Sequence, residues 1–323
     1  MSSLKEIAEM TGVSISTVSN VLNGRKNVSQ ETRDRILRCC EEQGYVHDAA
    51  PKKSKSDKDK RIVFIFSDFD REFYLKIIEG ISTFLNENGY DLIICTNKSS
   101  ENFLRSSFAR GTISLDGSLT DEFFRSVAKP EFPVVLMDRV FDYDNKNTKS
   151  VVVDNYPVMS QLVQSLVDKG FQRFGFLGGQ ASSLDNKERF SAFADTLEKN
   201  GIAFDQTYYY HGNYREQSGY QAAKLMILSN EYPEVLVCAN DNMAIGAMKA
   251  FEEHQISVPH NISITGFDDS DAAALAGLTT IKIPRYESGY LAAKELLELI
   301  KGNVNRDTVK IGASIVWRQS VRS

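Results

Sequence analysis

Hydrophobic residues in the first 45 positions recur at helical spacing, and this pattern predicts a compact group of three short helices. In the first, Leu4 and Ile7 share one face, Ser3 and Glu6 form a capping box, and the helix ends before Gly12. These signals place the first helix within residues 3–11.

The next two helices have start and stop signals of the same kind. One begins at an N-cap Ser14, where Val13 and Val18 form a hydrophobic staple, and ends at Asn23-Gly24. The other starts near Ser29, directs Ile36 and Leu37 inward, and ends at Gly44. The apolar stripe of the second helix consists of Val18, Val21 and Leu22.

After this region the pattern changes twice. Residues 47–60 contain no apolar side chain larger than Ala and are rich in Lys, Asp and Ser, which indicates a solvated linker. From residue 61 onward, apolar runs alternate with amphipathic helices, the pattern of a parallel sheet with helices on both faces. The runs are IVFIF, DLIIC, PVVLM, RFGFL, EVLVC and ISITGF. Their number over some 260 residues predicts two doubly wound lobes, with SVVVDN as a passage between them.

Composition argues against a membrane protein, a secreted protein and a metalloprotein. Hydrophobic residues make up 42% of the chain, and no apolar run is long enough for a transmembrane helix. The first ten residues lack the apolar stretch of a signal peptide, so we expect a cytoplasmic protein without membrane attachment. The cysteines at 39, 40, 95 and 238 and the four histidines are scattered, which predicts free, mostly buried thiols and no metal site or cofactor.

Charge is distributed unevenly. Residues 1–61 carry twelve Lys and Arg against nine Asp and Glu, whereas the whole chain has a net charge of −5. A mildly basic head on an acidic body favours a local contact with nucleic acid.

Polar side chains follow most of the apolar runs. Ligands of open α/β sheets bind beyond the carboxyl ends of the strands, so these residues are candidates for a binding site. They are Asp68, Asp138, Arg139, Gly178, Gly179, Asn240, Asp241, Asp268 and Asp269. With nearby aromatic rings they suit a polyhydroxylated ligand.

Simpler interpretations apply to each of these residues. An Asp or Asn after a strand is often only the N-cap of the next helix, and Gly178-Gly179 indicates a tight turn, not a phosphate cradle. Asp268 and Asp269 could form an acid–base pair, but neighbours on a loop point apart, so binding is the simpler role. The segment 208–210 reads as a partly buried strand of tyrosines. No nucleophile elbow, Walker A sequence or HExxH motif is present, so an enzyme is the less favoured class.

The N-terminal segment LKEIAEMTGVSISTVSNVLNGRKNVSQETRDRILRCCEEQGY closely resembles the DNA-binding head of the lactose/galactose-repressor family. The body continues the resemblance through PVVLMDR, FGFLGG, ANDNMAIGAM, ITGFDD, LTTI and IVWRQS. The resemblance implies a helix-turn-helix whose second helix enters the major groove, with base-edge contacts from Ile15, Ser16, Thr17 and Asn20. It also places Ser19 near phosphates, and Arg25 and Arg33 would neutralise them.

For the body, the resemblance implies the fold of periplasmic sugar-binding proteins, with the effector held between two lobes. The matching effector residues are Phe73, Tyr74, Asp138, Arg189, Tyr214, Asn240 and Asp268. A homodimer would read a pseudo-palindromic double-stranded operator, and a sugar or sugar derivative would change the closure of the lobes and so the spacing of the heads.

These inferences give a domain plan. The head comprises residues 1–46, the hinge or linker 47–60, and the effector-binding and dimerisation core 61–323. Within the core, lobe 1 spans about 61–157 and 283–305, and lobe 2 about 158–282 and 306–323.

The linker departs from the family pattern. The family's hinge helix carries a leucine that wedges into the minor groove, whereas here Pro51 falls where that helix would run and Ser54 takes the place of the leucine. Either the lysines of the linker bind DNA phosphates without kinking the DNA, or Pro51 begins a shorter hinge helix. A second departure is an irregular stretch at 97–120, which puts the third strand of lobe 1 in doubt.

The sequence therefore predicts a DNA-binding repressor of carbohydrate genes, controlled by a sugar or sugar derivative between two lobes. The alternative is a cytoplasmic sugar-binding protein whose atypical hinge impairs operator binding. A sugar-processing enzyme is a third class, disfavoured by the missing nucleophile and metal set. Operator binding separates the first two, and turnover of a bound sugar would reveal the third.

Overall fold

The computed structural model divides the chain into two compact units, residues 1–59 and 60–323. It describes residues 4–22, 25, 28–43, 60–66, 73–96, 99–105, 108–137, 139–140, 145–303 and 307–323, and at position 73 only the backbone. The predicted linker, apart from Lys60, lies outside the described residues, and so do Ser3, Gly24, Gly44, Pro51, Ser54 and Asp68.

The first unit contains the three expected helices, α1 (Leu4–Thr11), α2 (Ile15–Leu22) and α3 (Gln30–Glu42). The predicted cap at Ser14 and the predicted helix start at Ser29 are confirmed, because Ser14 Oγ accepts from the backbone N–H of Thr17 at 3.1 Å and Ser29 Oγ from that of Thr32 at 3.3 Å. The core consists of Ile7, Ala8, Val18, Val21, Ile36 and Cys40. The inward orientation predicted for Leu37 is wrong: this side chain is 40% exposed, because Cys40 fills the core position one turn after Ile36.

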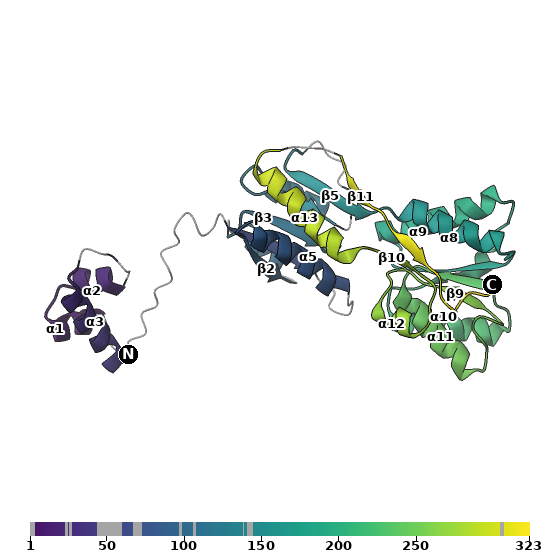
Figure 1. Ribbon diagram of the computed structural model, residues 1–323, viewed down its shortest axis with the longest axis horizontal. Coiled ribbons are helices and arrows are strands. Elements are labelled where there is room, and N and C mark those ends of the chain that lie inside the picture. The colour runs from purple at the N-terminus through teal and green to yellow at the C-terminus, as the bar shows by residue number, and fades with distance from the viewer. Residues whose placement is uncertain are drawn as a thin grey trace. The chain divides into compact units, whose positions relative to one another are not determined.

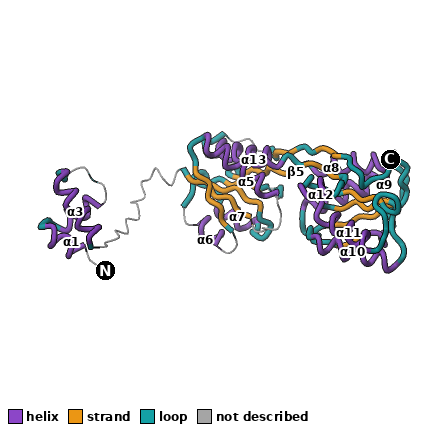
Figure 2. Tube along the Cα trace, turned by 60° about the horizontal axis from the view of Figure 1, so that its bottom comes forward, coloured by secondary structure: helices purple, strands orange, loops and turns teal. Residues whose placement is uncertain are grey.

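The second unit is an α/β core with two parallel sheets (Figures 1 and 2). The first sheet has the strand order β11-β5-β4-β3-β1-β2. Its strands are β1 (Arg61–Phe66), β2 (Asp91–Cys95), β3 (Gly111–Leu115), β4 (Val134–Leu136), β5 (Thr148–Val153) and β11 (Val309–Ile311). Its helices are α5 (Phe73–Glu87), α6 (Ser99–Arg105), α7 (Asp121–Val127) and α13 (Arg285–Ile300).

The second sheet has the order β7-β6-β8-β9. Its strands are β6 (Phe174–Gly178), β7 (Tyr209–His211), β8 (Val235–Cys238) and β9 (Ser263–Thr265). Its helices are α8 (Asn155–Asp168), α9 (Leu184–Lys199), α10 (Glu216–Ser229), α11 (Asp241–Glu253) and α12 (Asp271–Leu275), and a 3₁₀ turn at Gln206–Tyr208 precedes β7. A separate antiparallel pair joins β10 (Thr280–Lys282) to β12 (Ser314–Val316).

Two expectations about the first lobe need correction. The stretch at 97–120 does contain a regular third strand, since β3 pairs with β1 on one side and β4 on the other. The assignment of residues 306–323 to lobe 2 is wrong for β11, because this strand pairs in parallel with β5 of the first sheet. The chain therefore crosses between the lobes after β5, before α13 and again between β11 and β12 (Figure 1).

Each lobe has a buried apolar core built from both faces of its sheet. In the first lobe, α5 and α13 pack together and cover one face, where Phe64, Ile77 and Leu296 share a cluster. The second lobe buries Phe176, Phe193 and many smaller residues. All four cysteines are free thiols, three of them buried, as the sequence predicts. Among the described residues, no helix is long and apolar enough to cross a membrane.

Candidate functional site

A cavity of about 690 Å³ lies between the two lobes of the core, at the carboxyl ends of the strands. Both lobes contribute to its wall, as expected where ligands bind at open parallel sheets. The first lobe supplies Tyr74, Leu115, Gly117, Ser118, Asp121, Met137, Arg139, Val153 and, from the start of α13, Arg285. The second supplies Gln180, Ser182, Ser183, Leu184, Asp185, Arg189, Tyr214, Arg215 and Asp268.

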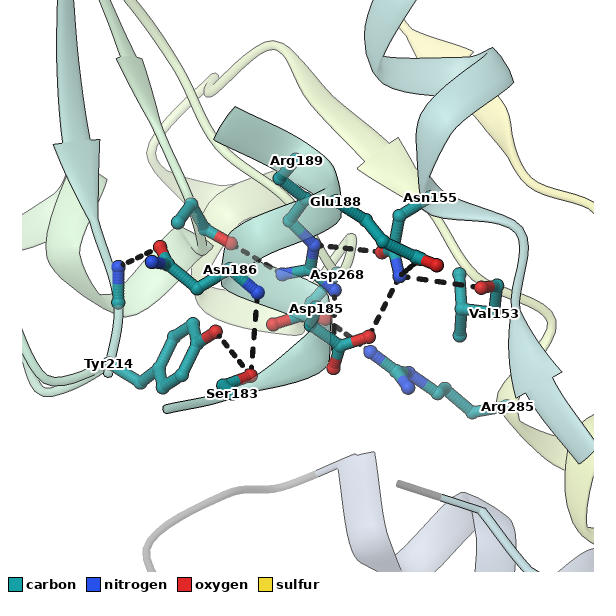
Figure 3. Close-up of polar contacts among 12 residues, drawn as sticks. Val153, Asn155, Ser183, Asp185, Asn186, Glu188, Arg189, Tyr214, Asp268 and Arg285 are labelled. Atoms are coloured by element: carbon teal, nitrogen blue, oxygen red, sulfur yellow. Dashed lines mark hydrogen bonds and ion pairs between the residues drawn. The ribbon is translucent and has the colours of Figure 1, made fainter. Parts of the chain in front are cut away.

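Arg189 is the most firmly held group on the wall of the second lobe. Its side chain is 3% exposed, and its guanidinium stacks 3.5 Å from the centroid of the Phe267 ring. Its Nε donates to Asn155 Oδ1 at 2.8 Å and a terminal nitrogen donates to the carbonyl of Ala239 at 2.6 Å (Figure 3). These contacts fix the direction of the guanidinium before any ligand arrives.

Asn155, at the start of α8, extends this network. Its side-chain amide donates to Asp185 Oδ1 at 2.8 Å and to Glu188 Oε2 at 3.0 Å (Figure 3). It thereby ties the start of α8 to the first turns of α9. The residue is 1% exposed. The prediction from sequence did not include it, because Asn155 is the last residue of SVVVDN, which is interpreted only as the passage between the lobes.

Tyr214 lies against the end of β6. Its hydroxyl donates to Ser183 Oγ at 3.0 Å (Figure 3). Its backbone is in the left-handed region, with φ of 68°. A Cβ at Gly179 would lie 2.1 Å from the Tyr214 ring, so only glycine leaves room for it there. The interpretation of Gly178-Gly179 as a tight turn is wrong, because Gly178 belongs to β6 and Gly179 is not in a turn. The constraint on both glycines is the packing of side chains against them.

Asn240 does not line the cavity. It is 3% exposed and is the N-cap of α11, where its Oδ1 accepts from the backbone N–H of Met243 at 3.1 Å. Its amide nitrogen donates to the carbonyl of Tyr214 at 3.0 Å. Asn240 therefore holds the backbone of Tyr214 in place without lining the cavity. Its role as the N-cap of α11 describes it better than a contact with the ligand.

Asp268 reaches the cavity from the loop after β9. Its carboxylate forms an ion pair with Arg285 (Figure 3). The neighbouring Asp269 pairs instead with Arg318 at 2.6 Å. The two carboxylates thus point apart, as expected from their adjacency. Asp268 has a φ of 123°, a strained backbone conformation for a residue with a side chain.

The buried Asp241 holds this loop in place. Its Oδ2 accepts from the backbone N–H of Ser270 at 2.8 Å, and its Oδ1 accepts from the hydroxyl of Thr280. Burial and, to a smaller degree, the negative charge of Asp268 raise the pKa of Asp241 to about 6. The loop that presents Asp268 is therefore anchored to a carboxyl group that titrates near neutrality.

The first lobe presents a different wall. Tyr74 is 6% exposed and stacks on Phe66, with ring centroids 5.0 Å apart. Arg139 donates to the carbonyl of Leu119 at 2.8 Å and to Asp121 at 3.0 Å. The predicted site residue Asp138 and the side chain of Phe73 lie outside the described residues.

In the first unit, the predicted DNA contacts start at the exposed beginning of α2. Ile15 is 48% exposed and Ser16 is exposed, whereas Thr17, Ser19 and Asn20 are half-buried. Ser14 Oγ lies within hydrogen-bond distance of the hydroxyls of Ser16 (2.7 Å) and Thr17 (2.8 Å).

The two arginines that are predicted to contact phosphates are linked to each other. A terminal nitrogen of Arg33 donates to the carbonyl of Arg25, and the backbone N–H of Arg25 donates to the carbonyl of Asn20 at 2.9 Å. Arg25 is exposed, and Arg33 is half-buried on α3. The segment after α2 is therefore tied to both α2 and α3.

Comparison with known proteins agrees with both units. Residues 3–48 match the family of bacterial regulatory proteins, lacI family, and residues 163–321 match the periplasmic binding protein-like domain. The HTH-type transcriptional regulator RegA of Clostridium saccharobutylicum is 28% identical over 98% of each chain. The chain thus combines a regulatory domain of the lacI family with a periplasmic binding protein-like domain, and its relatives are lacI-family regulators.

Solved structures show the same fold. A sugar-binding transcriptional regulator of this family from Enterococcus faecalis is 28% identical, with a TM-score of 0.74 over 82% of this chain and 98% of that one. The lac repressor dimer bound to operator and an anti-inducer is 24% identical, also with a TM-score of 0.74, over 100% of this chain and 99% of that one. The predicted fold, a helical head and an α/β core with parallel sheets, is confirmed.

Proposed function

We propose that this protein is a transcriptional repressor that binds a pseudo-palindromic operator as a homodimer and is controlled by a sugar or sugar derivative in the cavity between its lobes. The observation that carries this proposal is the cavity itself, with a pre-oriented arginine and a carboxylate on a wall shared by two lobes. Its volume of about 690 Å³ lies within the range of small-molecule sites.

The chemistry of the wall suits hydroxyl groups. Arg189 supplies N–H donors, Asp268 supplies carboxylate acceptors, and Tyr74 and Tyr214 supply flat apolar faces for a sugar ring. Because Arg189 is already held by Asn155 and Ala239, ligand binding loses little side-chain entropy there. Asp138 and Phe73 remain proposed ligand contacts.

The head recognises the DNA sequence. We assign base-edge contacts in the major groove to Ile15, Ser16, Thr17 and Asn20, and phosphate contacts to Ser19, Arg25 and Arg33. The hydroxyls of Ser16 and Thr17 bond to Ser14 in this structure, so they would exchange those bonds for contacts to DNA. Arg33 would also order the backbone at Arg25.

A ligand in the cavity would act on the head through the three segments in which the chain crosses between the lobes. A ligand that bonds to both lobes favours one degree of closure, and closure in a dimer changes the spacing of the two heads. Relatives of this chain are transcriptional regulators, which does not favour the alternatives of a sugar-binding protein without operator binding or of an enzyme.

The test is fluorescence anisotropy of the purified protein with its own promoter fragment, across a salt series and with a panel of sugars and sugar phosphates. We expect affinity for the fragment at least about a thousandfold above that for random DNA, and a shift of that affinity by one class of sugar. Asn20→Ala should weaken binding to the promoter without changing binding to random DNA. Equal affinity for promoter and random DNA would contradict the proposal.

A further inference from the structure

The described wall of the cavity has more positive than negative side chains. It contains four arginines and three aspartates, namely Arg139, Arg189, Arg215, Arg285, Asp121, Asp185 and Asp268. A neutral sugar needs only balanced donors and acceptors, which amides and hydroxyls supply without a net charge. The wall therefore has one guanidinium group more than it has carboxylates, although Asp121, Asp185 and Asp268 each pair with an arginine.

Two of these arginines are engaged within the lobe whose wall they form. Arg139 donates to the carbonyls of Leu119 and Asp116 and to Asp121. Arg189 donates to Asn155 and to the carbonyl of Ala239. Both arginines hold the wall in shape in addition to facing the cavity.

Arg285 differs because its ion pair connects the two lobes. It is the first residue of α13, which packs on the first sheet, and its partner Asp268 follows β9 of the second sheet (Figure 3). The side chains are 14% and 12% exposed, so solvent screens this pair only weakly. A ligand that enters between the lobes reaches both charges at once.

Besides the arginines of the wall, the start of α13 adds positive electrostatic potential around Arg285. The N-terminus of a helix carries roughly half a positive charge, and Arg285 occupies the first turn of the 16-residue α13. A cation is disfavoured at this end of a helix, so the side chain gains from a nearby anion. The helices α9 and α10 also begin at the cavity, where Ser183 and Arg215 are their N-caps.

We propose that the effector is an acidic sugar, carrying a carboxylate or a phosphate, and that Arg285 is the residue that selects for this charge. This inference rests on the proposed function, in which the cavity holds the effector. The guanidinium would share its donors between Asp268 and the anionic group, in the forked geometry that arginine forms with carboxylates and phosphates. Asp268 would still accept a bond from a sugar hydroxyl.

The test is titration calorimetry of the full-length protein with matched probes: glucose, glucuronate and glucose 6-phosphate, the corresponding galactose set, and inorganic phosphate. We expect an acidic member of one set to bind at least about tenfold more tightly than its neutral parent, and the carboxylate and phosphate members to show which anion fits. Neutral parents that bind as tightly as the acids, or a cavity that binds none of the probes, would overturn the inference. Promoter binding by the same preparation would leave the proposed function standing in either case.

Arg285→Met gives the second arm, with Arg322→Met as the matched control. Arg322 pairs with Glu234 at 3.7 Å and does not line the cavity, so its loss removes the same charge elsewhere. We expect R285M to reduce the affinity for the acidic probe at least about tenfold and to leave the neutral parent within about threefold, while R322M changes neither. Equal weakening of acid and neutral parent by R285M would show that Arg285 only supports Asp268, and would contradict a role in selecting charge.

Discussion

The two lobes meet at one cavity but build its wall in different ways. In the second lobe, Arg189 and Tyr214 are held by the buried residues Asn155, Ala239 and Asn240. The loop that carries Asp268 is anchored by the buried Asp241. In the first, Tyr74 rests on an aromatic neighbour and Arg139 bonds to nearby loops. Within the proposed function, the second lobe is therefore the pre-organised half of the effector site.

The strongest test of this difference compares the two arginines. Arg189→Ala leaves the side-chain oxygen Oδ1 of Asn155 and the backbone carbonyl of Ala239 without this donor in a buried site, at a cost of about 1–3 kcal/mol each. We expect it to lower the thermal midpoint of the core by several degrees and to abolish effector binding. Arg139→Ala, on a side chain 19% exposed, should have the smaller effect on both quantities. Equal losses in a paired melting and calorimetry experiment would contradict the comparison.

Packing around Tyr214 offers the next test. Gly179→Ala would force the ring to move, since the added Cβ would lie 2.1 Å from Tyr214 Cζ; overpacking of this kind costs about 1–3 kcal/mol. Gly312→Ala is the matched control, because nothing lies within 4 Å of its Cβ position and its φ is not positive. Urea denaturation should show destabilisation only for the first variant. A stable G179A variant with unchanged effector affinity would show that the Tyr214 ring is not fixed.

Asn240 allows positioning and ligand contact to be separated. Asn240→Asp keeps the cap acceptor for Met243 but replaces the donor to the Tyr214 carbonyl with an oxygen. We expect a loss of about 1–2 kcal/mol in stability and a moderate loss of effector affinity that follows the displacement of Tyr214. If Asn240 touched the ligand directly, affinity would fall sharply while the melting temperature stayed unchanged.

The smallest expected effect is a pH dependence from Asp241. Its pKa is raised from 3.8 to about 6, so the folded state keeps this proton where the unfolded chain has released it. Its contribution to stability is therefore complete below about pH 4 and is lost as the pH rises through 6. The free energy of unfolding of the wild type minus that of Asp241→Asn should fall over this window and then level off. A difference that stays constant between pH 4 and 7 would contradict the raised pKa.

The sequence was most informative where local patterns determine structure. Apolar runs followed by polar residues predicted the strands and pointed to Asp268, and the family resemblance added Arg189 and Tyr214; all three line the cavity. Ser14 and Ser29 capped their helices as expected because capping depends on only a few neighbouring residues.

What the sequence did not show depends on contacts between distant segments. Arg285 follows a lobe crossing and reads as an ordinary start of a helix, and its place beside Asp268 appears only once the two sheets are assembled. The pairing of β11 with β5 likewise joins segments more than 150 residues apart. Asn240 was assigned to the ligand because its motif follows a strand, but a cap and a ligand contact occupy the same position in sequence.

The central claim is that occupation of the cavity controls the head. The most direct measurement is the dissociation constant for promoter DNA with and without the sugar that binds the wild-type chain, for both the wild type and Arg189→Ala. We predict a shift of at least about fivefold for the wild type and none for the variant, which should still bind DNA. An equal shift in both proteins, or no shift in the wild type at saturating sugar, would contradict the account.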